Sequence, residues 1–270
     1  MARLLFLLLA CSALLGATDH RTSGNNYLSA QLQALQNDTQ RNPAVLWHER
    51  GLAMWQSQCV QCHGDISQLK RSAATFPRLR ADGTTLHNLE DQISYCLQKP
   101  KAIAAKAIDS TKTEPAGPRV NSTEASNAES DAVLSLSAAL HLAAKGQSIQ
   151  VGPEKLSASE ATQWQSRLNN GRILYEGRMG KMNLACMHCH DQKVGAQMRA
   201  DIISQGHPTG FPIYRMSWQT MGSFERRLRA CYSGVQSPLP APGNTDLRDL
   251  ELFMKVRANG MALDGPSIRR

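Results

Sequence analysis

The chain contains two copies of the pattern Cys-x-x-Cys-His, "CVQCH" at residues 59–63 and "CMHCH" at residues 186–190. This pattern is typical of c-type haem attachment, because two thiols can form thioethers with the haem vinyl groups while the adjacent histidine binds the iron. A single copy could also be a zinc knuckle or a redox dithiol, but two copies in one chain favour haem. We therefore predict two covalently bound c-type haems, held by Cys59, Cys62 and His63 and by Cys186, Cys189 and His190.

The two motifs belong to an internal repeat. The segments "FPRLRADGTTLHNLEDQISYC" (76–96) and "FPIYRMSWQTMGSFERRLRAC" (211–231) have the same length and align without a gap. A helical pattern precedes each motif, at 43–58 and 157–177, and an apolar helix closes each copy, at 131–146 and 245–260, with a glycine placed to stop it. Because aromatic residues make up only 5% of the chain, a bound cofactor could supply part of the core. The sequence predicts a mainly α protein with two tandem cytochrome c-like domains.

The order of segments along the 270 residues predicts the domain boundaries. Residues 1–17 combine an arginine, a leucine-rich run and small residues, the pattern of a signal peptide, although Cys11 leaves a lipid anchor as an alternative. We expect an N-terminal cytochrome domain at 30–150, with a polar insertion at 110–130, and a C-terminal domain at 151–270 that carries the active site. No later stretch approaches the ~20 apolar residues of a membrane helix, so a periplasmic protein without a transmembrane segment is predicted.

The repeat also bears on the second axial ligand of each iron. Electron-carrying cytochromes c commonly use methionine there, yet residues 64–150 contain none. Only Cys96 has a ligand-type counterpart in the other copy, Cys231, and this symmetry favours the two cysteines. The other candidates are His87 and His141 in the first copy and Met198, Met216 and Met221 in the second. An inert buried thiol or a disulfide between Cys96 and Cys231 are the alternatives for the cysteine pair.

The surroundings of the two cysteines differ in charge. "EDQISYC" in the first copy aligns with "ERRLRAC" in the second, so the formal charge of three positions changes from −1 to +3. Arg227 lies four residues before Cys231 and shares its helix face, whereas Arg226 points away. A neighbouring arginine favours a thiolate and an anionic substrate, so we predict that Arg227 binds substrate beside Cys231. A solvated basic helix face is the alternative.

From about Trp47 onward the chain resembles the SoxA family, the A subunits of the SoxAX cytochrome complex, an L-cysteine S-thiosulfotransferase. The resemblance is carried by "CVQCH", "CMHCH", "RMSWQTMGSFERRLRACYSG" and "LELFMKVRANGM". It implies that Cys231 is an axial ligand and the catalytic residue, able to carry an extra sulfur as a persulfide, and that Arg227 binds substrate. It also implies that His63, Cys96 and His190 are the other axial ligands.

The resemblance further implies a reaction and its partners. Thiosulfate would be joined to a cysteine of a carrier protein, SoxYZ, and the electrons would leave through c-type haem to a partner cytochrome, SoxX. The net charge of +8 suits anionic substrates, and nothing in the sequence indicates nucleic-acid binding. A dihaem electron carrier with methionine or histidine ligands is the competing function, and a structural zinc protein is a third.

Overall fold

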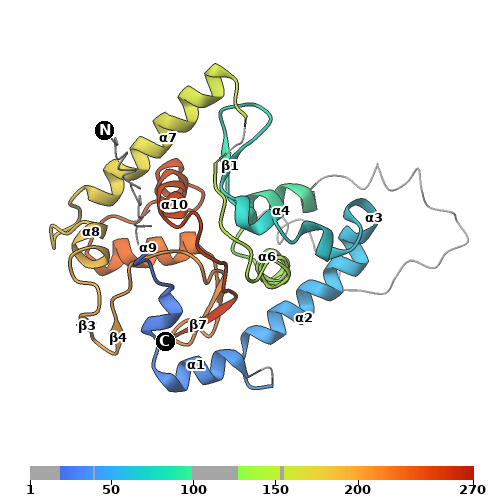
Figure 1. The fold of residues 1–270 in the computed structure, drawn as a ribbon, viewed down its shortest axis with the longest axis horizontal. Helices are drawn as coiled ribbons and strands as arrows, with labels where there is room; N and C mark the ends of the chain where they lie inside the picture. Colours follow the sequence, from blue (N-terminus) through green and yellow to red (C-terminus); the bar gives the residue numbers. More distant parts are fainter. Residues whose placement is uncertain (1–18, 39, 99–126, 153–154) are drawn as a thin grey trace, which may run out of the picture.

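The computed structural model describes residues 19–38, 40–98, 127–152 and 155–270. The predicted signal peptide at 1–17, with Cys11, and residues 110–126 of the predicted insertion lie outside these residues. The described chain is mainly helical with a few short strands, which confirms the prediction of a mainly α protein (Figure 1). No helix in the described ranges is long and apolar enough to cross a membrane.

The first half of the chain contains short helices around the motif at 59–63 and two longer helices that pack together. Its elements are η1 (Gly24–Tyr27), α1 (Ala30–Asn37), α2 (Ala44–Met54), η2 (Trp55–Cys59), α3 (Val60–His63), η3 (Ile66–Leu69), η4 (Ser72–Thr75), β1 (Arg78–Leu79), β2 (Leu86–His87), α4 (Leu89–Gln98) and α6 (Asp131–Ala143). Strands β1 and β2 pair antiparallel. The motif thus occupies the end of η2 and the whole of α3, which continue directly from α2, and α4 follows the β1–β2 hairpin.

The second half follows a similar order of elements. They are α7 (Ala158–Glu176), α8 (Cys186–His190), β3 (Gln197–Met198), β4 (Asp201–Ile202), β5 (Ile213–Arg215), β6 (Thr220–Gly222), α9 (Phe224–Gly234), α10 (Thr245–Arg257) and β7 (Ser267–Arg269). Helix α7 begins with a capping box, in which Ser157 and Glu160 bond each other's backbone. Strand β5 pairs antiparallel with β6 and parallel with β7. Hairpin β5–β6 therefore precedes α9 as hairpin β1–β2 precedes α4.

A close helix crossing occurs once in each half. A Cβ added to Gly51 on α2 would lie 2.0 Å from the carbonyl oxygen of Ser135 on α6, and a Cβ added to Gly171 on α7 would lie 2.0 Å from that of Asp249 on α10. Both crossings therefore require glycine. Helices α6 and α10 end three residues before Gly146 and Gly260, which have φ of 83° and 91°. The predicted helix stops are confirmed.

The two halves share a core and a buried ion-pair network. Helices α2, α3, α4 and α6 lie on one side of the molecule and α7 to α10 on the other (Figure 1). Arg248 of α10 donates from Nε and Nη2 to both carboxylate oxygens of Asp91 on α4, at 2.5 and 2.7 Å, and pairs with Glu225 on α9. Leu32 of α1, within the predicted first domain, packs in a cluster with Tyr214 and Ile268 of the second half.

Candidate functional site: two equivalent thiol and histidine sites

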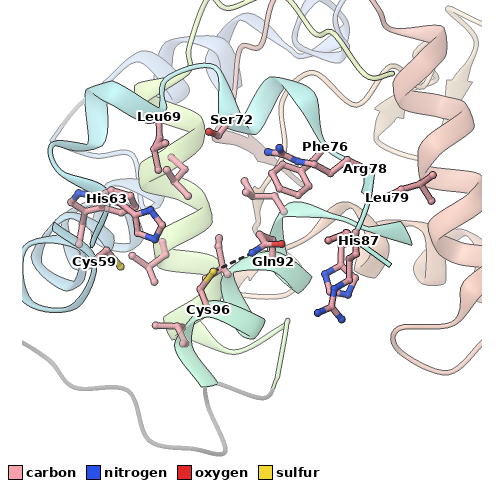
Figure 2. Close-up of a pocket in the computed structure, with 18 residues that line it drawn as sticks. Cys59, His63, Leu69, Ser72, Phe76, Arg78, Leu79, His87, Gln92 and Cys96 are labelled. Atoms are coloured by element: carbon pink, nitrogen blue, oxygen red, sulfur yellow. Dashed lines mark hydrogen bonds between the residues drawn. The ribbon is translucent and has the colours of Figure 1, made fainter. Parts of the chain in front are cut away.

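A cavity of about 480 Å³ lies beside the first motif. Its size falls within the range of roughly 300–1,000 Å³ that is usual for cofactor pockets. Most of the side chains around it are apolar, many of them from α4 and α6. The remaining lining residues are Cys59, His63, Ser72, Arg78, Arg80, His87, Gln92 and Cys96. Figure 2 shows His63 and Cys59 on one side and Cys96, from α4, reaching into the same space. The lining fits a flat apolar group held by thiols at its edge and by histidine and cysteine at its iron.

Neighbouring residues orient the ligands of this first site. The ring of Trp55 lies 5.8 Å from that of His63, and its Nε1 donates to the carbonyl oxygen of Gly64. The amide of Gln92, one turn before Cys96, donates to the Cys96 sulfur at 3.1 Å, as the dashed line in Figure 2 shows. Burial, followed by the nearby Cys96 and Cys62, raises the pKa of the Cys59 thiol to about 12. Cys59 and Cys96 are therefore close neighbours; Cys59 is half-buried, whereas Cys96 and Cys62 are exposed.

The second site brings together Cys231 of α9 and the motif on α8. The side chains of Cys231 and His190 share a hydrogen bond. His190 donates from Nδ1 to the carbonyl oxygen of Ser204 at 2.7 Å, which leaves Nε2 as the ring nitrogen available to a ligand. A Cβ on Gly206, which has φ of 74°, would lie 3.0 Å from this ring, so glycine makes room for it.

The motif thiols of the second site also lie near Cys231. Burial raises the pKa of Cys186 to about 12 and that of Cys189 as well, and in both cases the neighbouring Cys231 adds to the shift. The structure thus brings Cys186, Cys189, His190 and Cys231 together, as the sequence proposed. The same donor set, two thiols, one imidazole and one further cysteine, occurs at both sites.

Two arginines give the second site its electrostatic character. Burial alone raises the pKa of Cys231, but Arg227, the hydrogen bond and charge of His190, and Arg215 together lower it to about 7. Arg227 was predicted from its spacing on the helix. Arg215, at the end of β5, was missed, although its alignment with Arg80 in the repeat was a signal that could have found it. Its guanidinium lies 5.3 Å from the ring centroid of Trp218, and its Nε donates to the carbonyl oxygen of Arg270.

The other charge differences between the two copies have partners away from the cysteines. Arg226 stacks on Trp218 with its guanidinium 4.5 Å from the ring centroid, and Arg229 donates to the carbonyl oxygen of Pro240. Asp91, the counterpart of Arg226, pairs with Arg248 across the two halves. Of the three aligned differences, Gln92 against Arg227 is thus the one that acts on the repeated cysteine.

The remaining ligand candidates lie in different surroundings. His87 lines the first cavity, whereas His141 is buried and its Nδ1 donates to the carbonyl oxygen of Ser137. Met221 is fully buried in the cluster around Leu134, and Met198 and Met216 are 49% and 42% exposed. All six described cysteines are free thiols, so no disulfide joins Cys96 to Cys231. Within the described ranges, no group of three or more His, Cys, Asp or Glu residues could hold a metal ion alone.

Comparisons with known proteins agree with this arrangement. Residues 44–149 match the family model "SoxA/TsdA, cytochrome c domain". L-cysteine S-thiosulfotransferase subunit SoxA of Pseudaminobacter salicylatoxidans is 26% identical over 260 residues, with 93% of this chain and 82% of the relative covered. The SoxA subunit of Paracoccus pantotrophus is 26% identical over 254 residues, with 92% and 78% covered.

A solved structure has the same fold. The crystal structure of SoxXA from P. pantotrophus matches with a TM-score of 0.74 and 24% identity, over 93% of this chain and 87% of that chain. The curated relatives are SoxA subunits, the domain model is that of SoxA and TsdA, and the solved structure shows the same fold. Over most of its length the chain is therefore similar to SoxA subunits, and residues 44–149 match the cytochrome c domain of SoxA and TsdA proteins.

Proposed function

We propose that this chain is a dihaem SoxA subunit that joins thiosulfate oxidatively to a cysteine of a carrier protein. The observation that carries the proposal is the position of Cys231, which shares a hydrogen bond with His190 and has Arg227 and Arg215 as neighbouring charges. A thiol in such surroundings is reactive, because nearby cations favour the thiolate over the thiol. The names of the curated relatives support the same reaction.

Two tandem cytochrome c-like domains would each hold one haem. Cys59 and Cys62 would form the thioether bonds of the first haem, with His63 and Cys96 as axial ligands, and the cavity of about 480 Å³ supports this assignment. Cys186 and Cys189 would attach the second, with His190 and Cys231 as axial ligands. When bound, the haems would accept the electrons that the conjugation releases.

The chain's own residues account for the binding of substrate. Arg227 would hold the sulfonate end of thiosulfate by charge-assisted hydrogen bonds, Arg215 would add a second positive charge, and Cys231 would relay the sulfur. Overall, a carrier thiol and thiosulfate form one S–S bond, R–SH + S₂O₃²⁻ → R–S–S–SO₃⁻ + H⁺ + 2e⁻. The carrier thiol loses its proton to solvent, and both electrons leave through the haems.

The proposal includes partners and a compartment. We infer that SoxX binds this chain and removes the electrons, and that SoxYZ is the carrier; the solved SoxXA complex with the same fold supports the first. A periplasmic location agrees with the pattern of residues 1–17, and the net charge of +8 suits an anionic substrate. The first site has Gln92 where the second has Arg227, so we propose that it is not a second active site.

The equivalent cysteines provide the test. We expect Cys231→Ala to abolish thiosulfate-dependent turnover, and Cys96→Ala to change one haem spectrum while much of the turnover remains. Conjugation is measured directly by mass spectrometry of the carrier protein, and haem content by the absorption of each purified variant. Full turnover in Cys231→Ala, with both haems present, would refute the catalytic role. A methionine–iron absorption band in the wild-type chain would instead support a simple electron carrier.

A further inference from the structure

A small cavity lies between the two halves, beside the first site. Its volume is about 10 Å³, near the smallest space that holds one water molecule. Two ionisable residues from each half line it, Glu90 and His141 from the first and Glu251 and Lys255 from the second. Each of the four residues is 4–6% exposed. We name these four residues the interface cluster.

Apolar walls separate the interface cluster from the two thiol and histidine sites. Phe76 and Leu89 line both the small cavity and the cavity of about 480 Å³, so they form the wall on the first side. Their repeat counterparts, Phe211 and Phe224, form the wall on the other side, with ring centroids 4.7 Å apart. Both phenylalanines pack in the core that contacts Cys186. The interface cluster therefore lies between the two proposed haem sites, one side chain away from the first.

Hydrogen bonds fix the members of the interface cluster. Ser137 donates to Glu90 at 2.6 Å, and Asn88 donates to Glu251 at 3.1 Å. Lys255 donates to the carbonyl oxygen of Pro208 at 3.0 Å. The imidazole of His141 uses Nδ1 for the carbonyl oxygen of Ser137, so its Nε2 remains for another partner. A water molecule in the cavity could bond Nε2 together with the carboxylates and the ammonium group.

Acidic groups outnumber basic groups around this cavity. The charged groups that act on the cluster from the surrounding elements are Asp91, Glu129, Arg248 and Asp264, and Glu225 pairs with Arg248. Buried carboxylates without matching cations are costly when ionised, so such a cluster holds protons that solvent-exposed acids would release. Burial accordingly raises the pKa of Glu251 to about 7 and also raises the pKa of Glu90. It lowers the pKa of Lys255, and it lowers the pKa of His141 to about 3.

We propose that the interface cluster is a proton-binding site, occupied by one water molecule, that takes up one proton when the neighbouring haem of the first site is reduced by one electron. The inference rests on the proposed haem at His63 and Cys96. An added electron attracts a proton across the Phe76 and Leu89 wall, because charges interact strongly in a dry interior. The coupling is reciprocal, so protonation of the cluster also makes reduction easier. The interior then gains one electron and one proton, and its net charge does not change.

The sign of the pH effect follows from this coupling. Reduction raises the proton affinity of the cluster, so the pKa of the cluster is higher in the reduced state than in the oxidised state. In the pH interval between these two pKa values, reduction is accompanied by the binding of one proton. Across that interval the midpoint potential falls as pH rises. The slope approaches about 59 mV per tenfold change in proton concentration if one proton accompanies each electron. Outside the interval the potential does not depend on this cluster.

The experiment is a potentiometric titration of the haem-loaded protein from acidic to alkaline pH, followed by haem absorption. We expect a pH-dependent potential in the wild type and a nearly flat one in Glu251→Gln, because glutamine keeps the shape and cannot ionise. Glu90→Gln is the second variant, in case the first does not fold. Glu176→Gln, an exposed residue paired with Arg172, is the matched control and should keep the wild-type slope. Infrared difference spectra between the two redox states should contain a protonated-carboxyl band that shifts in D₂O.

The outcomes separate this inference from the proposed function. Two haems and normal turnover with a flat wild-type potential would overturn the inference alone. A slope that persists in both Glu251→Gln and Glu90→Gln would also overturn it. A chain without covalent haem would end both proposals, while loss of turnover in Cys231→Ala with an unchanged slope would support both.

Discussion

The two equivalent cysteines differ in the charges of their neighbouring side chains. Cys96 accepts a hydrogen bond from the neutral amide of Gln92, whereas Cys231 has the guanidinium of Arg227 at the same helix position. The hairpin before each helix adds to the difference. Arg80 of the first copy stacks on Tyr95 at 4.3 Å, while its counterpart Arg215 acts on Cys231. A repeated scaffold can thus keep one ligand set and change the chemistry of one copy through the charges around it.

The strongest expected effect comes from the ion-pair network that joins the copies. The repeat counterpart of Arg248 is Leu134, so Arg248→Leu makes the two copies alike at this position. It leaves Asp91 and Glu225 without their buried cation, and breaking a buried ion pair costs about 3–5 kcal/mol of unfolding free energy. Urea unfolding followed by circular dichroism measures the loss. Arg172→Leu, which removes an exposed pair with Glu176, should cost less than about 1 kcal/mol.

Exchange of the residue beside each cysteine tests the catalytic difference. Arg227→Gln gives the second copy the residue of the first, and the loss of a charged hydrogen bond to substrate, about 1.5–3 kcal/mol, corresponds to roughly 10–150-fold in kcat/KM. Steady-state kinetics with thiosulfate measures it. Gln92→Arg is the matched variant and should leave turnover at the wild-type level. An Arg227→Gln enzyme with unchanged kcat/KM would show that Arg227 does not bind substrate.

The glycines at the two helix crossings, Gly51 and Gly171, test whether the two copies are structurally equivalent. Gly51→Ala and Gly171→Ala each place a methyl group 2.0 Å from a backbone carbonyl oxygen, so both should destabilise the protein by about 1–3 kcal/mol. Thermal unfolding of the two variants measures the effect. Gly234→Ala is the matched control, because Gly234 is also a helical glycine, at the end of α9, and nothing lies within 4 Å of its added Cβ. A large effect at one crossing and none at the other would contradict the equivalence.

Local sequence patterns predicted many of the secondary-structure elements and one pair of neighbouring site residues. The positions of α4 and α9, the helix stops and the face shared by Arg227 and Cys231 follow from periodicity and from a gapless repeat. The partner of Asp91 did not follow, because Arg248 lies 157 positions away and its own repeat counterpart is apolar. Arg215 was missed for a related reason. Its effect on Cys231 depends on how hairpin β5–β6 packs beside α9, which is a tertiary property.

Composition could not reveal the interface cluster. Glu90, Glu251 and Lys255 look like ordinary solvated helix residues in the sequence, and charged residues are rarely fully buried. They are buried because α4, α6 and α10 meet where the two halves pack, as the lining of the small cavity shows. The burial of such residues can be recognised only in the three-dimensional structure, in which the two halves pack together.

The attachment of residues 21–36 to the far end of the chain also has a consequence for how the protein folds. Arg21 donates to the carbonyl oxygens of Arg257 and Asn259, and the side chain of Gln36 accepts from the backbone of Ile268. These contacts join positions more than 230 residues apart, so they form late: those of Arg21 require the chain up to residue 259, and that of Gln36 requires β7. The earliest described residues are therefore among the last to reach their final place, and they secure both halves as folding finishes.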